Sequence, residues 1–436
     1  MNRNIIYISV LTIFILILFN LHGQTIRLNS WKYLTDISAD LNQLFNYNLY
    51  EGQRWGMGLQ VTTPIGYNAK YPRDQQNAVQ LKGYGAYGLQ DHGLKYGGSV
   101  ALLMPRDRKR NMGIAFSHDL SRTGSRQLGS YSMLATYNNS NYVSSRYVGI
   151  NRLSLGFNRF VVNGFDIMAH LRFSREDYRF NERGYVFPTR YHGDAHMPYL
   201  HYIEQHLLVK YGNNLLLLFD GGYVKSDDTE ANSRLFAHFI AQYSAVKTMK
   251  NKRADRCYIF GQLGYTTPNT PFSRLFDLSG TAGYNYFFRN SFMTVSPTAF
   301  TAHQYAFLCL HYLWGHPLWQ TSFSTPQPFV QLSAMWGTLS RRNYGDRLIY
   351  SLRREMPVLP TTTQQINDDH VISVTAPSYG VLEPSVGIER IIRYGYLDLG
   401  IACAYQLTPQ AAPYHLRGKD NFAWVIMANL MLEYNN

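Results

Sequence analysis

Charged side chains alternate with apolar ones over short stretches of this chain, most clearly over residues 165–174. Phe165, Ile167, Ala169, Leu171 and Phe173 alternate there with Asp166, Met168, His170, Arg172 and Ser174. Successive side chains of a β-strand point to opposite faces, so this spacing predicts one apolar face and one face that carries Asp166, His170 and Arg172. A face with both acids and bases is wet, as in the lumen of a barrel.

Four more charged residues are candidates for the lumen: Glu51, Arg54, Glu383 and Glu389. They lie on strands that we expect to be neighbours when a barrel closes. Charges buried inside a barrel pair with one another, and such pairs can narrow a pore and select solutes. The alternative, which the sequence favours for each residue, is an ion-pair network that only holds the register of the strands.

Arginines also cluster in the main break of the strand pattern, residues 339–379. They are Arg341, Arg342, Arg347, Arg353 and Arg354, next to Tyr344 and Tyr350. Guanidinium groups form bidentate hydrogen bonds with phosphates and with the anionic groups of sugars. We therefore predict an extracellular loop that folds over or into the lumen. A disordered surface loop that merely meets lipopolysaccharide is an equal alternative.

Enzyme chemistry finds little support in the sequence. Ser117, His118 and Asp119 are adjacent, so on a strand they point to opposite faces and cannot form a triad. Cys257, Cys309 and Cys403 are far apart and contain no CxxC spacing, which argues against a disulfide framework or a zinc site. We expect no catalytic residue, no metal ligand set and no cofactor.

The composition favours strands over membrane helices. The chain has 436 residues and a net charge of +13, with 35 Tyr, 34 Gly and 24 Phe. Charged residues make up 16%, below the usual quarter, and the mean hydropathy is −0.26. Positive charge is scattered among Tyr and Gly, which speaks against nucleic acid and favours outer-membrane lipid and lipopolysaccharide as partners.

The N-terminus predicts export. Arg3 precedes an apolar run from Ile5 to Phe19, and Gly23 offers a small residue for cleavage. We interpret residues 1–23 as a cleaved signal peptide, residues 24–50 as a leader with a possible short helix, and residues 51–436 as the barrel. The helix is suggested by the spacing of Trp31, Leu34, Ile37, Leu41 and Leu44. Insertion would then need the outer-membrane assembly machinery.

Strand patterns recur from residue 55 to the end. The last one, Phe422 to Tyr434, has apolar residues at every even position, as a lipid-facing strand requires. Other candidates include 129–138 and 291–300. The tally predicts an all-β, antiparallel transmembrane β-barrel of about 16 strands, within a range of roughly 14 to 18. The strand that begins near Arg54 is expected to pair with the last strand, since a spanning sheet cannot leave an edge in lipid. A soluble periplasmic β-protein is the alternative.

Several short motifs resemble the barrel domain of a Gram-negative outer-membrane family of unknown function. That barrel usually follows a carboxypeptidase-regulatory-like module, and it is distantly similar to surface-antigen and outer-membrane assembly-factor barrels. The motifs are Tyr50–Gly58, Gly83–Gly88, Lys95–Gly97, Ile259–Gly261 with Thr267, Pro268, Pro271 and Leu275, His311 and Gly315, Trp336–Ser340, and Glu383–Ile392 with Asp398. The pattern starts at about residue 50, so we expect no such module here, and a partner role tied to it is in doubt.

These observations lead to three hypotheses about function. The leading one is a non-enzymatic outer-membrane channel, porin-like, or a barrel that assists envelope transport or export, with an envelope partner still to be found. The others are an outer-membrane hydrolase acting on lipid or lipopolysaccharide, and a docking barrel with a plugged lumen. An open lumen favours the channel, and a filled one favours docking.

The parity of the last strand predicts different costs for two neighbouring substitutions. Ala428→Arg puts a charge on the lipid face and is expected to cost about 2–4 kcal/mol and to impair assembly. Met427→Arg, on the lumen face, is expected to cost less. Heat-modifiable gel migration of the barrel in membrane fractions measures how much of each variant is folded. If the two variants fold equally well, the assignment of even residues to the lipid face is wrong.

Overall fold

The structure is a computed structural model. It describes residues 25–28, 36–40, 46–48, 51–66, 70, 76–104, 111–122, 147–179, 199–212, 214–227, 233–249, 255–278, 292–295, 300–340, 347–351, 356–357, 371–394, 397–408 and 421–430. The predicted signal peptide and the predicted strand at 129–138 lie outside these residues. Among those described, no helix is long and apolar enough to cross a membrane.

Strands make up almost all of the described secondary structure, joined by one short 3-10 helix, η3 (Phe272–Arg274). The strands are β1 (Thr25–Leu28), β2 (Asp36–Asp40), β3 (Asn46–Asn48), β4 (Gly52–Pro64), β5 (Ala78–Gly88), β6 (Leu94–Leu103), β7 (Asn111–Arg122), β8 (Tyr147–Val162), β9 (Phe165–Arg179), β10 (Leu200–Tyr211), β11 (Leu215–Ser226), β12 (Arg234–Thr248), β13 (Arg256–Thr266), β14 (Phe276–Asp277), β15 (Thr301–Ala302), β16 (Gln304–Leu313), β17 (Gln327–Thr338), β18 (Arg347–Ser351), β19 (Met356–Pro357), β20 (Val371–Thr375), β21 (Val381–Tyr394), β22 (Leu397–Tyr405) and β23 (Phe422–Leu430).

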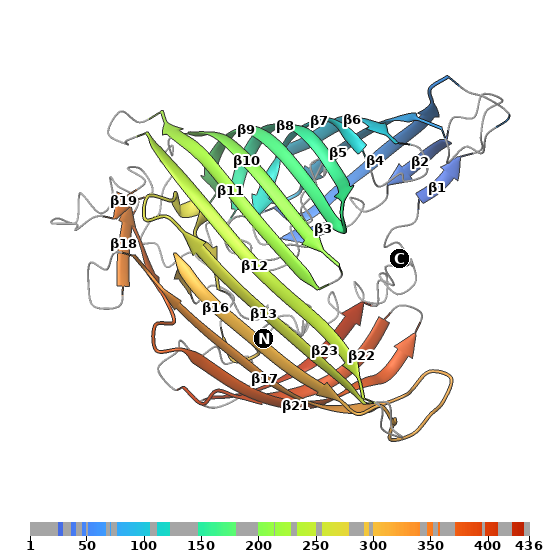
Figure 1. The fold of residues 1–436 in the computed structure, drawn as a ribbon, viewed down its shortest axis with the longest axis vertical. Coiled ribbons are helices and arrows are strands. Elements are labelled where there is room, and N and C mark those ends of the chain that lie inside the picture. Colours follow the sequence, from blue (N-terminus) through green and yellow to red (C-terminus); the bar gives the residue numbers. More distant parts are fainter. Residues whose placement is uncertain are drawn as a thin grey trace.

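Most of the strands form a single sheet of 18 strands. It runs from β1 through β2, β4 and the following strands in chain order to β13, and then through β16, β17, β21 and β22 to β23, with every neighbouring pair antiparallel. The sheet curls so that its first and last strands lie in opposite walls (Figure 1). The predicted all-β antiparallel architecture is confirmed, as a single curled sheet.

The N-terminal leader contributes strands, and at residues 36–40 a strand, β2, is found where the spacing suggested a helix. Ile37, which set the helical spacing, lies in β2, and β2 pairs with β4 from Asp36↔Thr62 to Asp40↔Gly58. β3 pairs with the start of the same edge of β4, so that β2 and β3 act as one interrupted strand. A helix would have left this edge of β4 without backbone partners, which is costly for a spanning sheet.

The predicted closure between the strand of Arg54 and the last strand is also wrong. One edge of β4 is taken by β2 and β3 and the other by β5, while β23 pairs with β22. Within the described residues no ladder joins β23 to the N-terminal strands. With β2 and β3 counted as one strand and the short β1 set aside, the sheet of 18 reduces to 16 strands, as the tally predicted.

Side-chain exposure on the walls is the inverse of that in a water-soluble protein. On β17, Val330 is 41% exposed and Leu332 is 38% exposed, whereas Gln331 and Ser333 are 3% and 0% exposed. On β4, Arg54 is fully buried between exposed neighbours. In the described part of β23, Phe422 and Ile426 are exposed, whereas Ala423 and Val425 are buried, which agrees with the predicted parity. The outward face is therefore apolar and the inward face carries the polar groups.

Connections alternate between the two ends of the antiparallel sheet and differ in length. At one end lie short turns such as 163–164, 212–214 and 395–396. At the other end lie 123–146, 180–199, 267–303 and 339–380. In the last of these, the predicted long loop, β18 pairs with β19 and β20 in a small sheet of its own.

Candidate functional site

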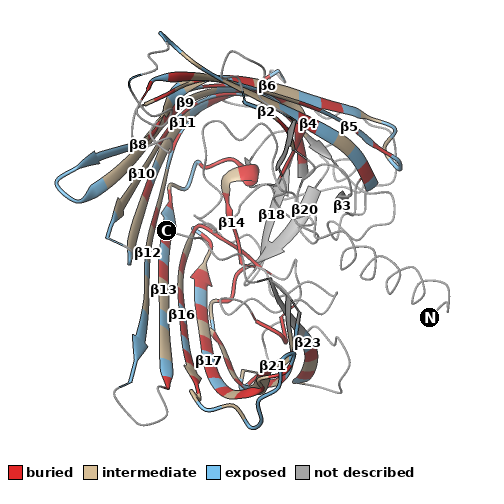
Figure 2. Cartoon of the chain, turned by 90° about the vertical axis from the view of Figure 1, so that its right-hand side faces the viewer, coloured by how far each residue is buried: buried red, intermediate tan, exposed pale blue. Residues whose placement is uncertain are grey.

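The described parts of the connection between β13 and β16 (residues 267–303) lie between the two walls (Figure 2). We call it the interior segment. Its described parts are 267–278, 292–295 and 300–303, and β14 pairs there with β15. The strand predicted at 291–300 is wrong, because all side chains from Phe292 to Val295 are buried and none shows the alternation of a wall strand.

An apolar core joins the interior segment to the walls. Phe276 lies 4.5 Å from the ring of His238 and 4.6 Å from that of Tyr305, and Phe292 lies 5.5 Å from Phe307. Gly264 on β13 makes room for this packing, since a Cβ there would lie 2.0 Å from Tyr305 and 2.8 Å from Phe276. Apolar side chains on all sides of the segment explain why it forms no alternating strand.

Arg274, at the end of η3, holds the segment to two neighbouring wall strands. Its guanidinium donates to Glu204 on β10 at 2.6 and 2.9 Å, and to Glu176 on β9 at 3.0 and 2.9 Å. Its Cζ also lies 4.3 Å from the ring centre of Tyr202, whose hydroxyl is 3.0 Å from Ser273 Oγ. Both carboxylates are buried, so the clamp neutralises charges that have little access to water.

The charge on Arg274 is permanent in this setting. Burial by itself lowers the pKa of the guanidinium, but the carboxylates of Glu176 and Glu204 raise it well above its ordinary value. The clamp therefore responds to movement or substitution of its partners, and no ordinary change of pH removes the positive charge.

A second anchor lies on the opposite wall. Glu383 on β21 is fully buried and accepts the backbone N–H groups of Met293 at 2.9 Å and Thr294 at 2.8 Å, together with the Thr294 hydroxyl. Glu383, one of the predicted lumen charges, therefore faces the interior segment. Its partners are backbone amides of the interior segment and no basic side chain of the first strands.

Arg54 and Glu51 belong to a third cluster, on the inward face of β4–β7. Arg54 donates to both carboxylate oxygens of Asp119, at 2.8 and 2.9 Å, and the Tyr84 hydroxyl donates to the same carboxylate at 2.5 Å. Glu51 pairs with Lys95 at 2.9 Å and lies 3.7 Å from Arg54. Both residues are thus paired with side chains of β6 and β7.

A row of polar side chains continues the inward face over β9–β12. Arg172 lies 3.4 Å from His206, and His206 contacts Asp220 at 2.8 Å, which in turn lies 3.4 Å from His238. Arg172 thus faces inward as predicted. Among the described residues no group of acidic, histidine and cysteine side chains is arranged to hold a metal ion.

The remaining predicted residues are placed as follows. Asp166 pairs with Arg159 at 3.0 Å near the short-turn end, where about a third of each side chain is exposed. Glu389 is buried 3.4 Å from His311. The backbone of Arg347 lies in β18, but its side chain is not described. The other four loop arginines lie outside the described residues: Arg341, Arg342, Arg353 and Arg354.

The candidate triad is split between the two faces. Asp119 pairs inside with Arg54, whereas His118 on the other face lies 2.6 Å from Asn151 Oδ1. Ser117 is buried on the inward face. These three residues therefore cannot act together, as the alternation predicted.

Several solved structures share part of this arrangement. BamA from Haemophilus ducreyi matches at 11% identity over 91% of this chain and 70% of its own, with a TM-score of 0.48. CdiB from Acinetobacter baumannii matches at 9% over 87% of this chain and 57% of its own, with a TM-score of 0.39. The outer membrane protein OprD from Pseudomonas aeruginosa matches at 9% over 87% and 90%, with a TM-score of 0.27.

These similarities are too weak to carry an argument about function. The chain spans little more than half of the CdiB chain that it matches. No protein-family model and no curated protein matches the sequence. The strand pairing of the chain itself establishes the fold.

Sequence reasoning missed the clamp. Arg274 stands among Phe272, Leu275 and Phe276 in a stretch without period-two alternation, so it was assigned to no face. The sequence does contain an indication of the clamp. A basic residue within an apolar stretch that lacks strand alternation is expected to be buried, and a buried base needs an acidic partner. Glu176 on β9 and Glu204 on β10 point to the inward face of their strands, and they are the acids that pair with Arg274.

Removal of Arg274 is expected to be costly. Arg274→Met removes the hydrogen-bonded counter-ion of Glu176 and Glu204 and leaves only Arg152, 3.7 Å from Glu176, so we expect a cost on the order of 3–5 kcal/mol. Urea unfolding of the protein in detergent measures the loss. The matched control is Arg159→Met, which breaks the partly exposed pair with Asp166 and is expected to cost about 0–1 kcal/mol.

A compensated variant completes the test. Arg274→Met combined with Glu176→Gln and Glu204→Gln removes the buried charges together and is expected to recover part of the stability. If Arg274→Met unfolds at the same urea concentration as the native protein, the guanidinium does not anchor the segment.

Proposed function

We propose that the protein is an integral outer-membrane β-barrel of the transport type, in which the interior segment controls passage through the lumen. The observation that carries the proposal is the inverted exposure of the walls. Exposed Trp55, Met57 and Leu59 on β4 alternate with the buried Arg54. Apolar surface in water costs roughly 25 cal/mol per Å², so such a face is stable only against hydrocarbon.

The lengths of the connections supply an orientation. Barrels of the outer membrane have short periplasmic turns and long outer loops. We therefore place 163–164, 212–214 and 395–396 on the periplasmic side, and the interior segment and 339–380 on the outer side. This orientation gives the lumen a cover that enters from outside.

The interior supports a passage that opens by movement of the segment. One guanidinium clamp at β9–β10 and one carboxylate on β21 supply its polar anchors on the two walls. The long loop reaches the same place, since β20 lies beside β15 and Ala376 packs into the core cluster that contains Phe292. Loop and segment are then expected to move together.

A second candidate is a docking barrel whose interior segment never leaves. Leu275, Phe276 and Phe292 are fully buried, which favours a permanently filled lumen. Burial of each such side chain stabilises the filled state by about 1.5–3 kcal/mol. Movement of the segment out of the lumen would lose this stabilisation. The two candidates differ in whether the native protein makes that movement.

Conductance separates the two candidates. Native protein, Arg274→Met and Arg159→Met are reconstituted in planar bilayers, and single-channel currents are recorded. A controlled passage predicts larger or more frequent openings for Arg274→Met, because the segment loses its clamp to β9 and β10. Arg159→Met is expected to match the native protein. Equal, closed behaviour of all three folded proteins contradicts a mobile segment and leaves the docking barrel.

Deletion of 343–376 tests the long loop separately. If this loop governs access, its removal is expected to raise the conductance, because β20 no longer lies against the interior segment. Heat-modifiable migration shows whether the shortened barrel is folded. An unchanged conductance in a folded barrel means that the loop is a surface feature whose arginines meet lipopolysaccharide only.

A further inference from the structure

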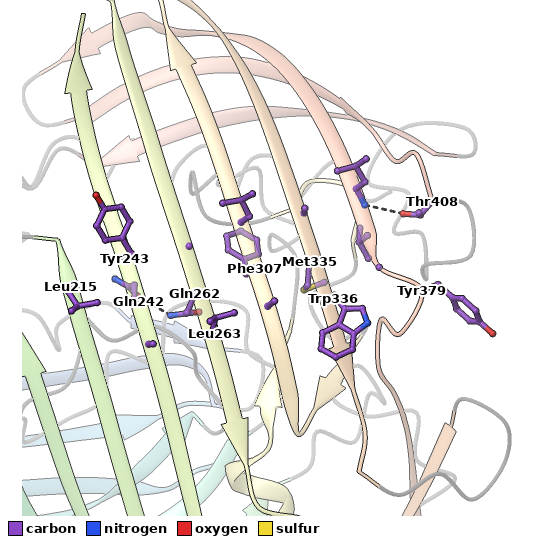
Figure 3. A pocket seen from close by; sticks show the side chains of 18 residues that line it. Leu215, Gln242, Tyr243, Gln262, Leu263, Phe307, Met335, Trp336, Tyr379 and Thr408 are labelled. Atoms are coloured by element: carbon purple, nitrogen blue, oxygen red, sulfur yellow. Dashed lines mark hydrogen bonds between the residues drawn. The ribbon is translucent and has the colours of Figure 1, made fainter.

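The outward wall contains an apolar furrow with a volume of about 650 Å³, which crosses β12, β13, β16 and β17 and reaches the start of β21 (Figure 3). Its floor is formed where outward positions carry small residues: Ala241, Gly261, Ala306, Ala334 and Gly380. Its banks are formed by large outward residues such as Tyr243, Leu263 and Trp336. A convex barrel wall is thus hollowed along one band.

The register of the strands explains the hollow. Gly261 is paired with Tyr243 on one side and Leu308 on the other, and Leu308 is paired with Ala334. In the next row Leu263 is flanked by Ala241 and Ala306. Small and large side chains therefore alternate along two neighbouring rows, and the small ones leave a continuous recess.

The furrow runs obliquely across the height of the wall. One row of register partners leads from Leu215, the first residue of β11, through Gly261 to Leu382 at the start of β21. Leu215 follows a short turn, whereas Leu382 follows the long connection. Strands of a barrel are tilted by roughly 35–45°, so a row across them climbs from one rim towards the other.

The lining offers hydrocarbon and little else. Gln262 donates its side-chain amide N–H to Gln242 Oε1 at 3.0 Å. Thr408 accepts the N–H of Leu382 at 3.1 Å, and Trp336 Nε1 donates to the carbonyl of Ser378 at 3.1 Å. Nearly all of the surface that lines the furrow is apolar, so the furrow does not suit a polar ligand.

We propose that the furrow seats one acyl chain of a membrane lipid, which enters at the long-connection rim between Trp336 and Tyr379. The inference rests on the proposed membrane residence of the barrel. The furrow is continuous with the exposed apolar surface of Leu308, Leu310 and Leu332, so in a bilayer it opens onto lipid. An unfilled recess forfeits dispersion contacts along its lining, and a flexible chain can follow an oblique furrow. The convex wall of a second copy cannot enter it.

Photolabelling by lipid tests the proposal on the full chain. The protein is inserted into vesicles of phosphatidylethanolamine and phosphatidylglycerol that contain a lipid with a diazirine in one acyl chain. After illumination, cross-linked peptides are mapped by mass spectrometry. We expect cross-links to concentrate on the small residues Ala241, Gly261, Ala306 and Ala334, relative to outward residues of β4–β7. An even distribution around the barrel overturns the inference.

A matched pair of glycine substitutions supplies the control. Gly261 and Gly85 both face outward, and a Cβ at either position meets no atom within 4 Å. Gly261→Phe fills the furrow and is expected to abolish the concentrated labelling, whereas Gly85→Phe on β5 leaves it unchanged. Equal loss, or no loss, in both variants overturns the inference.

Two further readouts separate the possible failures. Flotation of the protein with the vesicles reports membrane residence, and a native protein that does not float contradicts the proposed function itself. The molecular mass in detergent reports assembly. A dimer whose furrow peptides cross-link to a second copy instead of lipid overturns the acyl-chain occupant.

Discussion

Pairing of buried charges is the constraint on which the interior of this protein depends. Because the outward face is apolar, acids and bases of the wall strands such as Arg54, Asp119, Glu176 and Glu204 lie buried on the inward face. Arg54 with Asp119 and Arg274 with Glu176 and Glu204 show the result: bidentate contacts between groups that are almost inaccessible. Each pair holds two segments in register, since loss of one partner leaves a buried charge behind.

The interior segment adapts to two kinds of inward surface. Arg274 meets carboxylates on β9 and β10, and Glu383 meets backbone amides of 293–294, so polar groups are matched at both ends. Between these ends Phe276 and Phe292 pack on aromatic wall residues. A segment with both kinds of contact fits one position in the lumen, and it can leave only if both are broken.

The outward wall is not uniform either. Most of it carries large apolar side chains, but the alternation of small and large residues across β12–β17 hollows a band. Two features therefore go beyond the alternation of apolar and polar residues along a strand: the interior segment on the inward side and the furrow on the outward side. Both depend on the order and register of strands, which bring residues from distant parts of the chain into one row.

Alternation along single strands made the architecture predictable. The parity of Phe422 and Ile426, and the inward position of Arg54, Arg172 and Glu383, follow from local patterns because side-chain direction in a strand is decided by the next residue. The same local reasoning failed for residues 24–50, where a few apolar residues suggested a helix. The edge of β4 required backbone partners, and that requirement outweighed the spacing.

The sequence by itself therefore determined the class of fold, the facing of its strands and the absence of a Ser117–His118–Asp119 triad. The tertiary structure alone decided which charges meet. Asp119 lies 65 residues from Arg54, and Glu176 lies 98 residues from Arg274. The alternation within a strand contains no information on the neighbouring strand or its register. In stretches without alternation, such as 272–276, the direction of each side chain cannot be inferred from the sequence. It depends on the wall residues that surround the segment.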